Sequence, residues 1–192
     1  MDLAKQLLKQ TDWVVLDTET TGLGYKAEAV SIGVLSSDGQ VLLGTLVKPT
    51  RSIPFDARRV HGITDEMVQT APTFKEILPD LLKVTANKKI VVYNADYDRR
   101  IVEQSFKPYT KFAIENRVVF FNDMAHMMKP ENWIDVMGPY AEFWGEWNDW
   151  HQNYRWQKLT AACQQQGVTI ANAHRAIGDC QMTLALIRKL GA

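Results

Sequence analysis

The stretch VVLDTETTGL, residues 14–23, changes from apolar to acidic within a few positions. Together with Trp13, its first residues have the β-branched and apolar side chains of a buried strand, which we predict over residues 13–18. Two carboxylates, Asp17 and Glu19, follow with one residue between them. Side chains two apart in a strand face the same way, so both acids project together if the strand reaches Glu19. The alternative is a solvated turn in which both charges face water.

Composition and charge restrict the class of protein. The chain has 192 residues, 46% of them hydrophobic, which fits one globular domain over residues 1–192. Lys+Arg and Asp+Glu are equal at 22 each, so any nucleic-acid binding is expected to be local. The two cysteines, Cys163 and Cys180, lack metal-ligand spacing and favour a reducing, cytoplasmic location. Residues 1–12 are typical of a short amphipathic helix rather than of a signal peptide or a membrane span.

The order of the remaining elements predicts an α/β fold, a mixed sheet flanked by helices. Strands over residues 29–36 and 41–48, joined by the hairpin signal Asp38-Gly39, give an antiparallel meander at the start of the chain. The polar stretch from there to Gly62 is expected to lack a regular element. In the rest of the chain we expect a helix capped by Thr64 and interrupted at Pro72, helices over 73–83, 95–106, 156–167 and 178–190, and strands over 89–93 and 117–122.

A second acidic stretch, VVYNADYDRRIV at residues 91–102, places two aspartates on a predicted helix. Asp96 and Asp98 are two residues apart and therefore point to nearly opposite sides. Asp96 falls on the charged, solvated face, whereas Asp98 falls on the apolar face. A buried aspartate is unfavourable unless it is paired, hydrogen-bonded to a local donor or bound to a metal.

A third stretch, AHRAIGDCQMT at residues 173–183, repeats this pattern. Asp179 lies near the start of the last predicted helix, on a stripe of mostly apolar positions that includes Met182 and Leu186. Its carboxylate could alternatively satisfy backbone N–H groups at the helix start. His174 is expected in the loop that enters this helix, where a histidine considered alone is more often a surface residue than a functional one.

Taken together, the three stretches predict a metal site. Four carboxylates brought together repel one another, and their pKa values rise unless cations neutralise them. Two divalent ions supply the balancing charge, and oxygen-only ligands favour Mg²⁺ or Mn²⁺ over zinc. Two such ions about 3.5–4 Å apart stabilise the attacking and leaving oxygens in phosphodiester cleavage. A neighbouring histidine can take the proton from the attacking water.

The three stretches resemble the signatures of the DEDDh exonucleases, the DnaQ-like branch of the RNase H-like superfamily. The matching motifs are LDTETTGL, NADYD and HRAIGD, with VHGITDEMV between the first two. The resemblance spans about residues 11–190 and implies a five-stranded sheet whose first three strands are antiparallel. It implies metal-dependent 3′-5′ hydrolysis of DNA or RNA that releases nucleoside 5′-monophosphates. The expected partner is therefore a nucleic acid with a free 3′ end, and we expect it to be single-stranded.

The resemblance also implies a role for each matching residue. The four acids Asp17, Glu19, Asp98 and Asp179 would hold two Mg²⁺ or Mn²⁺ ions, and His174 would be the general base. The pocket for the terminal nucleotide would be lined by Thr18, Thr20, Asn94 and the loop His61, Gly62 and Ile63. For His61, a purely structural hydrogen bond to the backbone is an equally good interpretation.

The second motif departs from the family pattern at two positions. Tyr93 stands where the family usually has His, and Asp96 stands where it usually has a small residue. Neither change removes an expected metal ligand. We therefore expect them to affect substrate preference rather than activity.

Five of the six tryptophans lie between residues 133 and 156, within and just after an insert expected at about 124–155. The helical spacing of Trp144 and Trp147 fits a small satellite core packed on the sheet. The alternatives are a stacking surface for unpaired bases and a docking site for a protein partner. Acids in the segment, such as Glu146 and Asp149, argue against strong phosphate binding.

Two other classes of function are compatible with the same fold. One is a non-catalytic module that binds nucleic acid or a polymerase, and the other is an RNase H-type endonuclease. The complete set of four acids and one histidine argues against the first, because a retired site would tolerate losses. By resemblance, the HGIT segment and the His174–Asp179 pair favour cleavage from an end. The chain ends two residues after Leu190, which favours a freestanding enzyme over a subunit tethered to a polymerase.

Overall fold

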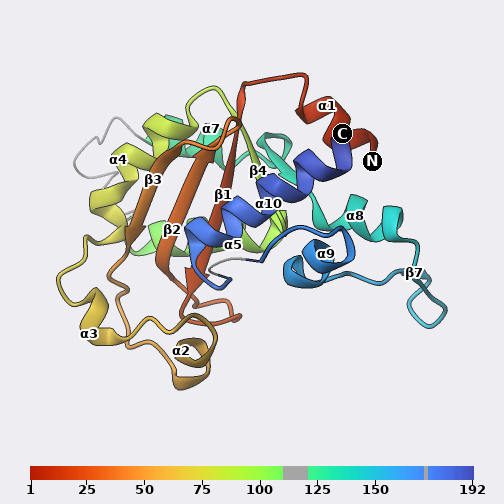
Figure 1. The fold of residues 1–192 in the computed structure, drawn as a ribbon. Helices are drawn as coiled ribbons and strands as arrows, with labels where there is room; N and C mark the ends of the chain where they lie inside the picture. The colour runs from red at the N-terminus through yellow and green to blue at the C-terminus, as the bar shows by residue number, and fades with distance from the viewer. Residues whose placement is uncertain (110–120, 171–172) are drawn as a thin grey trace.

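The computed structural model describes residues 1–109, 121–170 and 173–192 (Figure 1). Among these residues, five strands form the main sheet in the order β3-β2-β1-β4-β5, and β6 and β7 form a separate hairpin. The β1–β2 and β2–β3 pairs are antiparallel, while β1–β4 and β4–β5 are parallel, so the predicted mixed sheet with an antiparallel start is confirmed. The strands are β1 Trp13–Thr20, β2 Ala29–Ser36, β3 Val41–Leu46, β4 Lys89–Val92, β5 Trp133–Asp135, β6 Trp147–Asn148 and β7 Asn153–Tyr154.

Helices cover both faces of this sheet. Helix α10 crosses one face over β1 and β2 (Figure 1), and α4 and α5 pack on the other face. No helix in the described part of the chain is long and apolar enough to cross a membrane. The helices are α1 Asp2–Leu7, α2 Phe55–His61, α3 Asp65–Val68, α4 Phe74–Thr85, α5 Ala95–Phe106, α7 Phe121–Met127, α8 Met137–Trp144, α9 Leu159–Gln165 and α10 Ala176–Gly191, with 3₁₀ turns η1 Lys107–Tyr109 and η2 Pro130–Asn132.

The side chains of β1 alternate between these two faces. Leu16 belongs to the core under α4 and α5, whereas Val15 belongs to the core under α10. By the same period of two, Asp17 and Glu19 project on the α10 side and Thr18 projects on the α5 side. Because the strand continues through both acids, the alternative of a solvated turn is wrong.

Gly33 of β2 lets α10 approach the sheet closely. Gly33 is the register partner of Asp17, and a Cβ atom at Gly33 would lie 2.8 Å from the backbone carbonyl carbon of Ala176. The Cys180 thiol donates to the Gly33 carbonyl oxygen at 3.4 Å. The first turn of α10, which carries Asp179, is therefore held directly against the acid-bearing end of β1.

The fifth strand differs from the prediction. We expected it over residues 117–122, but residues 121–122 begin α7, and the rest of that stretch lies outside the described residues. The strand that pairs with β4 is Trp133–Asp135, inside the segment expected as an insert. Trp133 is buried there, and its indole N–H donates to the Met127 carbonyl at 2.8 Å. A strand of three residues is too short for a recognisable period of two, so its pairing with β4 decides it.

Two helix predictions also need correction. The stretch before Gly62, expected to lack a regular element, contains α2, which starts after Pro54 at its N-cap and ends at Gly62 in the left-handed conformation (φ +69°). These two residues act as the start and stop signals of a short helix. The helix expected over 156–167 begins only at Leu159, because Lys158 is in an extended conformation.

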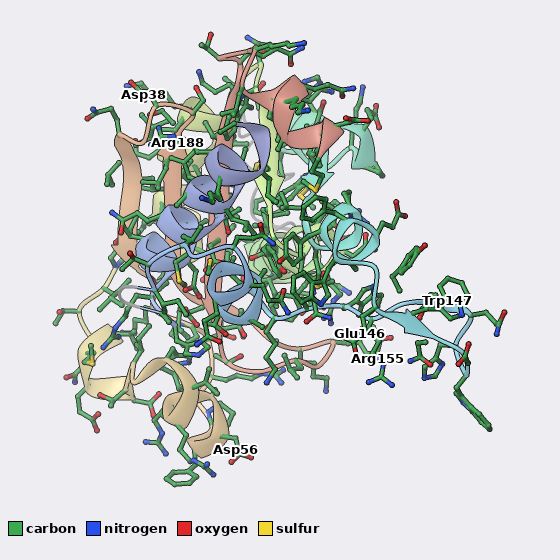
Figure 2. All side chains as sticks on the ribbon, turned by 45° about the vertical axis from the view of Figure 1, so that its right-hand side comes forward. Asp38, Asp56, Glu146, Trp147, Arg155 and Arg188 are labelled. Carbon is green, nitrogen blue, oxygen red and sulfur yellow. The ribbon has the colours of Figure 1, made fainter. Side chains whose placement is uncertain are left out.

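The tryptophan-rich segment divides into a buried and an exposed part. Trp133 and Tyr140 are buried in the two main cores that flank the sheet, and Trp144 and Trp147, whose spacing predicts a satellite core, are exposed. Gly145 ends α8 in the left-handed region, so Trp144 and Trp147 do not share one helix. Figure 2 shows the β6–β7 hairpin projecting from the body of the protein, with Trp147 at its base. The exposed tryptophans are Trp144, Trp147, Trp150 and Trp156.

Candidate active site

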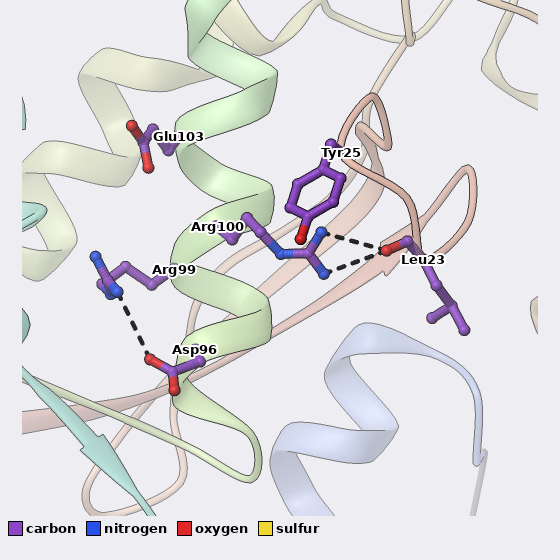
Figure 3. A pocket seen from close by; sticks show the side chains of 6 residues that line it. All are labelled: Leu23, Tyr25, Asp96, Arg99, Arg100 and Glu103. Atoms are coloured by element: carbon purple, nitrogen blue, oxygen red, sulfur yellow. Dashed lines mark hydrogen bonds and ion pairs between the residues drawn. The ribbon is translucent and has the colours of Figure 1, made fainter.

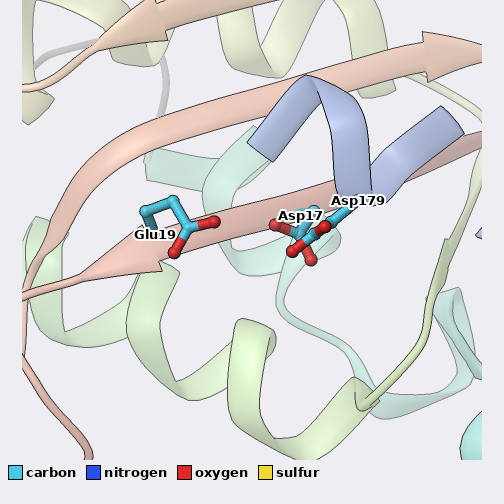
Figure 4. A group of neighbouring side chains, drawn as sticks. All are labelled: Asp17, Glu19 and Asp179. Atoms are coloured by element: carbon cyan, nitrogen blue, oxygen red, sulfur yellow. The ribbon is translucent and has the colours of Figure 1, made fainter. Parts of the chain in front are cut away.

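Three carboxylates from the first and third sequence motifs meet at the end of β1. One oxygen from each of Asp17, Glu19 and Asp179 lies within 4.8 Å of the others (Figure 4). Two of these acids come from β1 and the third from the first turn of α10. The period of the strand and the close approach of α10 over Gly33 together bring the acids into one cluster.

Asp98 is not one of the three acids within 4.8 Å of one another, but it approaches them from the opposite face of the sheet. Strand β4 pairs with β1 only as far as Val15, so the Thr18 N–H has no strand partner on that side. Asp98 Oδ1 accepts from the Thr18 N–H at 3.1 Å and from the Thr18 hydroxyl at 2.7 Å. Asp98 is buried, as its place on the apolar face of α5 predicted, and its donor lies 80 residues away in sequence.

Burial, and to a smaller extent charge repulsion, raises the pKa values of the four acids. Burial raises the pKa of Asp17 well above its usual value, and Asp98, Asp179 and Glu19 raise it further by charge repulsion. Burial, Asp179 and Asp98 raise the pKa of Glu19 to about 8, while the pKa of Asp98 rises to about 7, chiefly through burial. The pKa of Asp179 is also raised by burial, although the His174 N–H partly offsets this. Four neighbouring carboxylates are unfavourable when all of them are ionised, so bound protons or cations are required to neutralise them.

The side chains present fit a divalent metal. Among the described residues, Glu19 Oε1 is one of the buried side-chain oxygens with no hydrogen-bond partner, and it lies within the carboxylate cluster. A buried unpaired carboxylate oxygen is strongly disfavoured unless a cation completes its surroundings. An all-oxygen donor set suits Mg²⁺ or Mn²⁺.

His174 stands at the entrance of α10, in the loop where it was predicted. Its side chain is exposed and lines the same pocket as Glu19 and Asp179. Its backbone N–H donates to Asp179 Oδ1 at 3.1 Å, and its φ of +61° lies in the left-handed region, which is uncommon outside glycine. The backbone conformation at His174 is thus coupled to the carboxylate of Asp179.

His61 is fixed by hydrogen bonds at both ring nitrogens. The Ile63 N–H donates to Nδ1 at 3.0 Å, so Nε2 carries the hydrogen of the neutral ring and donates to the Thr20 carbonyl at 3.1 Å. Burial lowers the pKa of His61, which favours this neutral form. The structural interpretation of His61 therefore holds, and the residue also lines the pocket.

A pocket of about 930 Å³ opens beside the carboxylates, within the size range of ligand sites. Of the residues predicted to contact substrate, it is lined by Thr18, Thr20, His61 and Asn94. Gly62 and Ile63 are not among the lining residues, and the Ile63 side chain is instead buried in a small core with Val30, Ile53 and Val68. The lining residues that the sequence did not single out include Val60, Tyr97, Met137 and Leu159, and Trp156 of the tryptophan-rich segment also lines the pocket.

Tyr97 and Trp156 had weak sequence signals. Tyr97 directly precedes Asp98 in the second motif, and its hydroxyl lies 2.6 Å from Thr20 Oγ1. Trp156 is the last tryptophan of the tryptophan-rich segment and reaches the pocket because residues 156–158 are not helical.

A second groove adjoins this pocket at Leu23 (Figure 3). The Arg100 guanidinium donates to the Leu23 carbonyl at 3.2 and 3.3 Å, and it lies 5.6 Å from the centroid of the Tyr25 ring. These contacts fix the loop that follows β1. Asp96 forms an exposed ion pair with Arg99 at 3.6 Å, so it lies on the solvated face of α5 as predicted.

The fold and the carboxylate cluster together define a class of protein, a nuclease with the RNase H-like architecture. A family model described as exonuclease, RNase_T, matches residues 14–187. The chain is 42% identical over 190 residues to the uncharacterized exonuclease CP81 of Escherichia phage 186, covering 97% of this chain and 91% of that protein. It is 31% identical to the DNA polymerase III subunit epsilon of Treponema pallidum, covering 91% of this chain and 74% of that protein. The match to the epsilon subunit of Buchnera aphidicola spans only 46% of that protein.

Solved structures share the fold. Escherichia coli exonuclease I in complex with a dT13 oligonucleotide has a TM-score of 0.71 at 17% identity, over 94% of this chain and 41% of that chain. Exonuclease X in complex with 5′ overhanging duplex DNA has a TM-score of 0.64 at 24% identity, over 93% of this chain and 90% of that chain.

The chain therefore belongs to the RNase_T exonuclease family. The resemblance to the DnaQ-like exonucleases is confirmed, and with it the RNase H-like fold and the 3′-5′ exonuclease class of activity. The alternative of a non-catalytic binding module is not favoured.

Proposed function

We propose that residues 1–192 form one DEDDh exonuclease domain that removes nucleotides from the 3′ end of a single strand and releases nucleoside 5′-monophosphates. Asp17, Glu19, Asp98 and Asp179 are the proposed ligands of two Mg²⁺ or Mn²⁺ ions. DNA is the substrate to test first, because several relatives are named as subunits of DNA polymerase III.

The observation that carries this proposal is the clustering of Asp17, Glu19 and Asp179 within 4.8 Å, with Glu19 Oε1 buried and unpartnered. A protein that only bound nucleic acid would have no use for mutually repelling acids at the mouth of its core. Bound divalent ions would neutralise the acids, polarise the scissile phosphate and lower the pKa of water.

The remaining residues of the site have positioning and proton-transfer roles in this proposal. Thr18 holds Asp98 through two hydrogen bonds, which orients the carboxylate toward the end of β1. His174, exposed at the pocket and linked through its backbone to Asp179, is the proposed general base for the attacking water. His61 holds the backbone at Thr20 and thereby shapes the wall for the terminal nucleotide.

A digestion panel tests the proposal. The wild-type protein is mixed with matched 5′-labelled DNA and RNA oligomers, single- and double-stranded, with either the 3′ or the 5′ end blocked, in Mg²⁺, Mn²⁺ or EDTA. We expect a ladder of shortened single-stranded DNA that requires metal and disappears when the 3′ end is blocked. Internal cuts in a 3′-blocked strand would instead support an endonuclease, and no cleavage under any condition would contradict the proposal.

A protein partner at the tryptophan-rich segment stays a prediction. The exposed residues Trp144 and Trp147 are the surface on which it would bind. The names of the epsilon-subunit relatives make a DNA polymerase the first partner to test.

A further inference from the structure

Trp156 is a large apolar side chain left exposed on the wall of the proposed active-site pocket. It is 70% exposed and lines the same pocket as Glu19, His174 and Asp179. Single exposed hydrophobic residues are common on protein surfaces and by themselves indicate nothing. What distinguishes Trp156 is that it lines the pocket into which Glu19 and Asp179 also face.

The backbone on both sides of Trp156 is anchored. The Arg155 N–H donates to the Glu146 carbonyl at 2.8 Å, and the two side chains form an ion pair at 3.4 Å (Figure 2). After Trp156, the Gln157 carbonyl accepts from the Tyr93 hydroxyl at 2.9 Å. Tyr93 is the residue that stands in place of the usual histidine of the second motif, so this departure provides an anchor for the segment. The indole is therefore presented at a defined position.

The pocket has two chemically different parts. Val60 and Leu23, which are 57% and 79% exposed, line it together with Trp156 and form an apolar rim. Glu19 and Asp179 contribute carboxylates whose oxygens lie within 4.8 Å of each other and of Asp17, an arrangement that suits bound cations. A ligand that satisfies both parts carries a flat apolar group next to an anionic group, which is the chemistry of a nucleotide.

We infer that Trp156 stacks on a base close to the 3′ end of the substrate strand, next to the phosphodiester that is cleaved; this inference rests on the proposed function. Base–aromatic stacking tolerates any sequence because every base presents a π-face, and losing one stacked base weakens binding by about 5- to 150-fold. Trp156 thus sets affinity for an unpaired 3′ end, while the carboxylates carry out the chemistry.

Steady-state kinetics on a single-stranded dT12 oligomer test the inference. Trp156→Ala should raise KM about tenfold with kcat nearly unchanged, and Trp156→Phe should restore most of the affinity, because phenylalanine keeps a stacking face. Trp150→Ala is the matched control: Trp150 is 88% exposed on the β6–β7 hairpin and does not line this pocket. It should leave both constants unchanged.

Abasic substrates locate the stacked base. Oligomers that lack one base at each of the last four positions are compared in the wild type and in Trp156→Ala. At the position where Trp156 stacks, an oligomer that lacks the base should give the same KM with the wild type and with Trp156→Ala. Additive effects at every position, or an unchanged KM in Trp156→Ala, would overturn the inference and would leave this surface to a protein partner.

Binding without turnover separates this inference from the proposed function. Fluorescence anisotropy of a labelled dT12 oligomer with Mg²⁺ is measured in Asp17→Asn, with and without Trp156→Ala, and weaker binding in the double variant is expected. If the wild type digests nothing while this binding still depends on Trp156, the proposed hydrolysis fails and the stacking site stands. If the wild type digests DNA and Trp156 has no effect on either measurement, the stacking site fails alone.

Discussion

The carboxylate cluster and the tryptophan-rich segment are built in opposite ways. In the cluster, each acid comes from a regular element, and the Asp179 carboxylate is further held by the backbone N–H of His174. Asp98, which lies beside the cluster on helix α5, is held in the same way by the backbone N–H of Thr18. In the segment after β5, the exposed tryptophans stand at the end of a helix, on a two-stranded hairpin and on an extended stretch. Groups that take part in chemistry need fixed geometry, whereas groups that contact a flexible strand need accessible area. Changes in the cluster should therefore remove turnover, whereas a change at Trp156, the tryptophan that lines the pocket, should alter affinity.

The largest effect is expected at Asp98, and Asp96 of the same motif provides the contrast. Asp98→Ala should lower turnover by about 10³-fold or more, because it removes a charge at the reacting centre. Asp96→Ala, at the neighbouring position on the solvated face of α5, should retain most activity because the Asp96 side chain is exposed and its ion pair with Arg99 lies at the surface. Gel-based digestion of a 5′-labelled single strand measures both. An essential Asp96 with a dispensable Asp98 would reverse the assignment of the two helix faces.

A smaller effect is expected from Gly33, which touches no substrate. In Gly33→Ala the new Cβ would lie 2.8 Å from the backbone of Ala176, so α10 must shift and carry Asp179 with it. We expect a loss of about 1–3 kcal/mol in the free energy of unfolding and about a 10²-fold loss of turnover. Gly24→Ala is the matched control because a Cβ there meets nothing within 4 Å. Equal activity in the two variants, measured beside urea unfolding, would show that α10 does not control the geometry of the site.

The smallest effect concerns the response of stability to pH, which should originate in the cluster. In metal-free protein, the folded state keeps a proton on Glu19 up to a pKa of about 8, whereas the unfolded chain releases it near 4.5. The folded state therefore binds more protons in this interval, and the free energy of unfolding falls as pH rises through it. We expect the melting temperature in EDTA to drop by a few degrees as the pH rises from 4.5 to about 8. Mg²⁺ or Mn²⁺ should restore the melting temperature most at the high end of this pH range.

Glu19→Gln separates this effect from other titrating groups. His61, whose pKa is lowered by burial, acts in the opposite direction but is common to both proteins. The wild type should therefore lose more stability with rising pH than Glu19→Gln does. Identical pH profiles by differential scanning calorimetry would show that the burial of Glu19 and its repulsion by neighbouring acids do not affect folding, and Trp150→Ala should leave the wild-type profile unchanged.

Local patterns predicted the parts of the fold that depend on local geometry. The period of two in β1 placed Asp17 and Glu19 together, and the helical period separated Asp98 from Asp96. The hairpin signal joined β2 to β3 correctly. Pro54 and Gly62 indicate an irregular loop in the sequence, but they flank helix α2. Proline and glycine occur at the ends of helices as well as in loops, so they do not distinguish the two.

Other features had no local signal. Strand β5 has three residues and forms because β4 offers an unpaired edge. Asp98 finds its donor in Thr18 because β4 stops pairing with β1 at Val15, which no pattern near Asp98 encodes. Trp156 lines the pocket from a stretch that is not helical, and the Tyr93 hydroxyl holds that stretch by donating to the neighbouring carbonyl of Gln157.

The sequence by itself therefore determined which side chains this exonuclease offers for chemistry, since residue type and period are properties of short stretches of chain. Only the tertiary structure decided how close those side chains come, which edge accepts the last strand and which tryptophan reaches the pocket. The physical reason is that pairing of strand edges and contact between distant helices depend on the space left by the whole packed core, and that space is defined only once every element is in place.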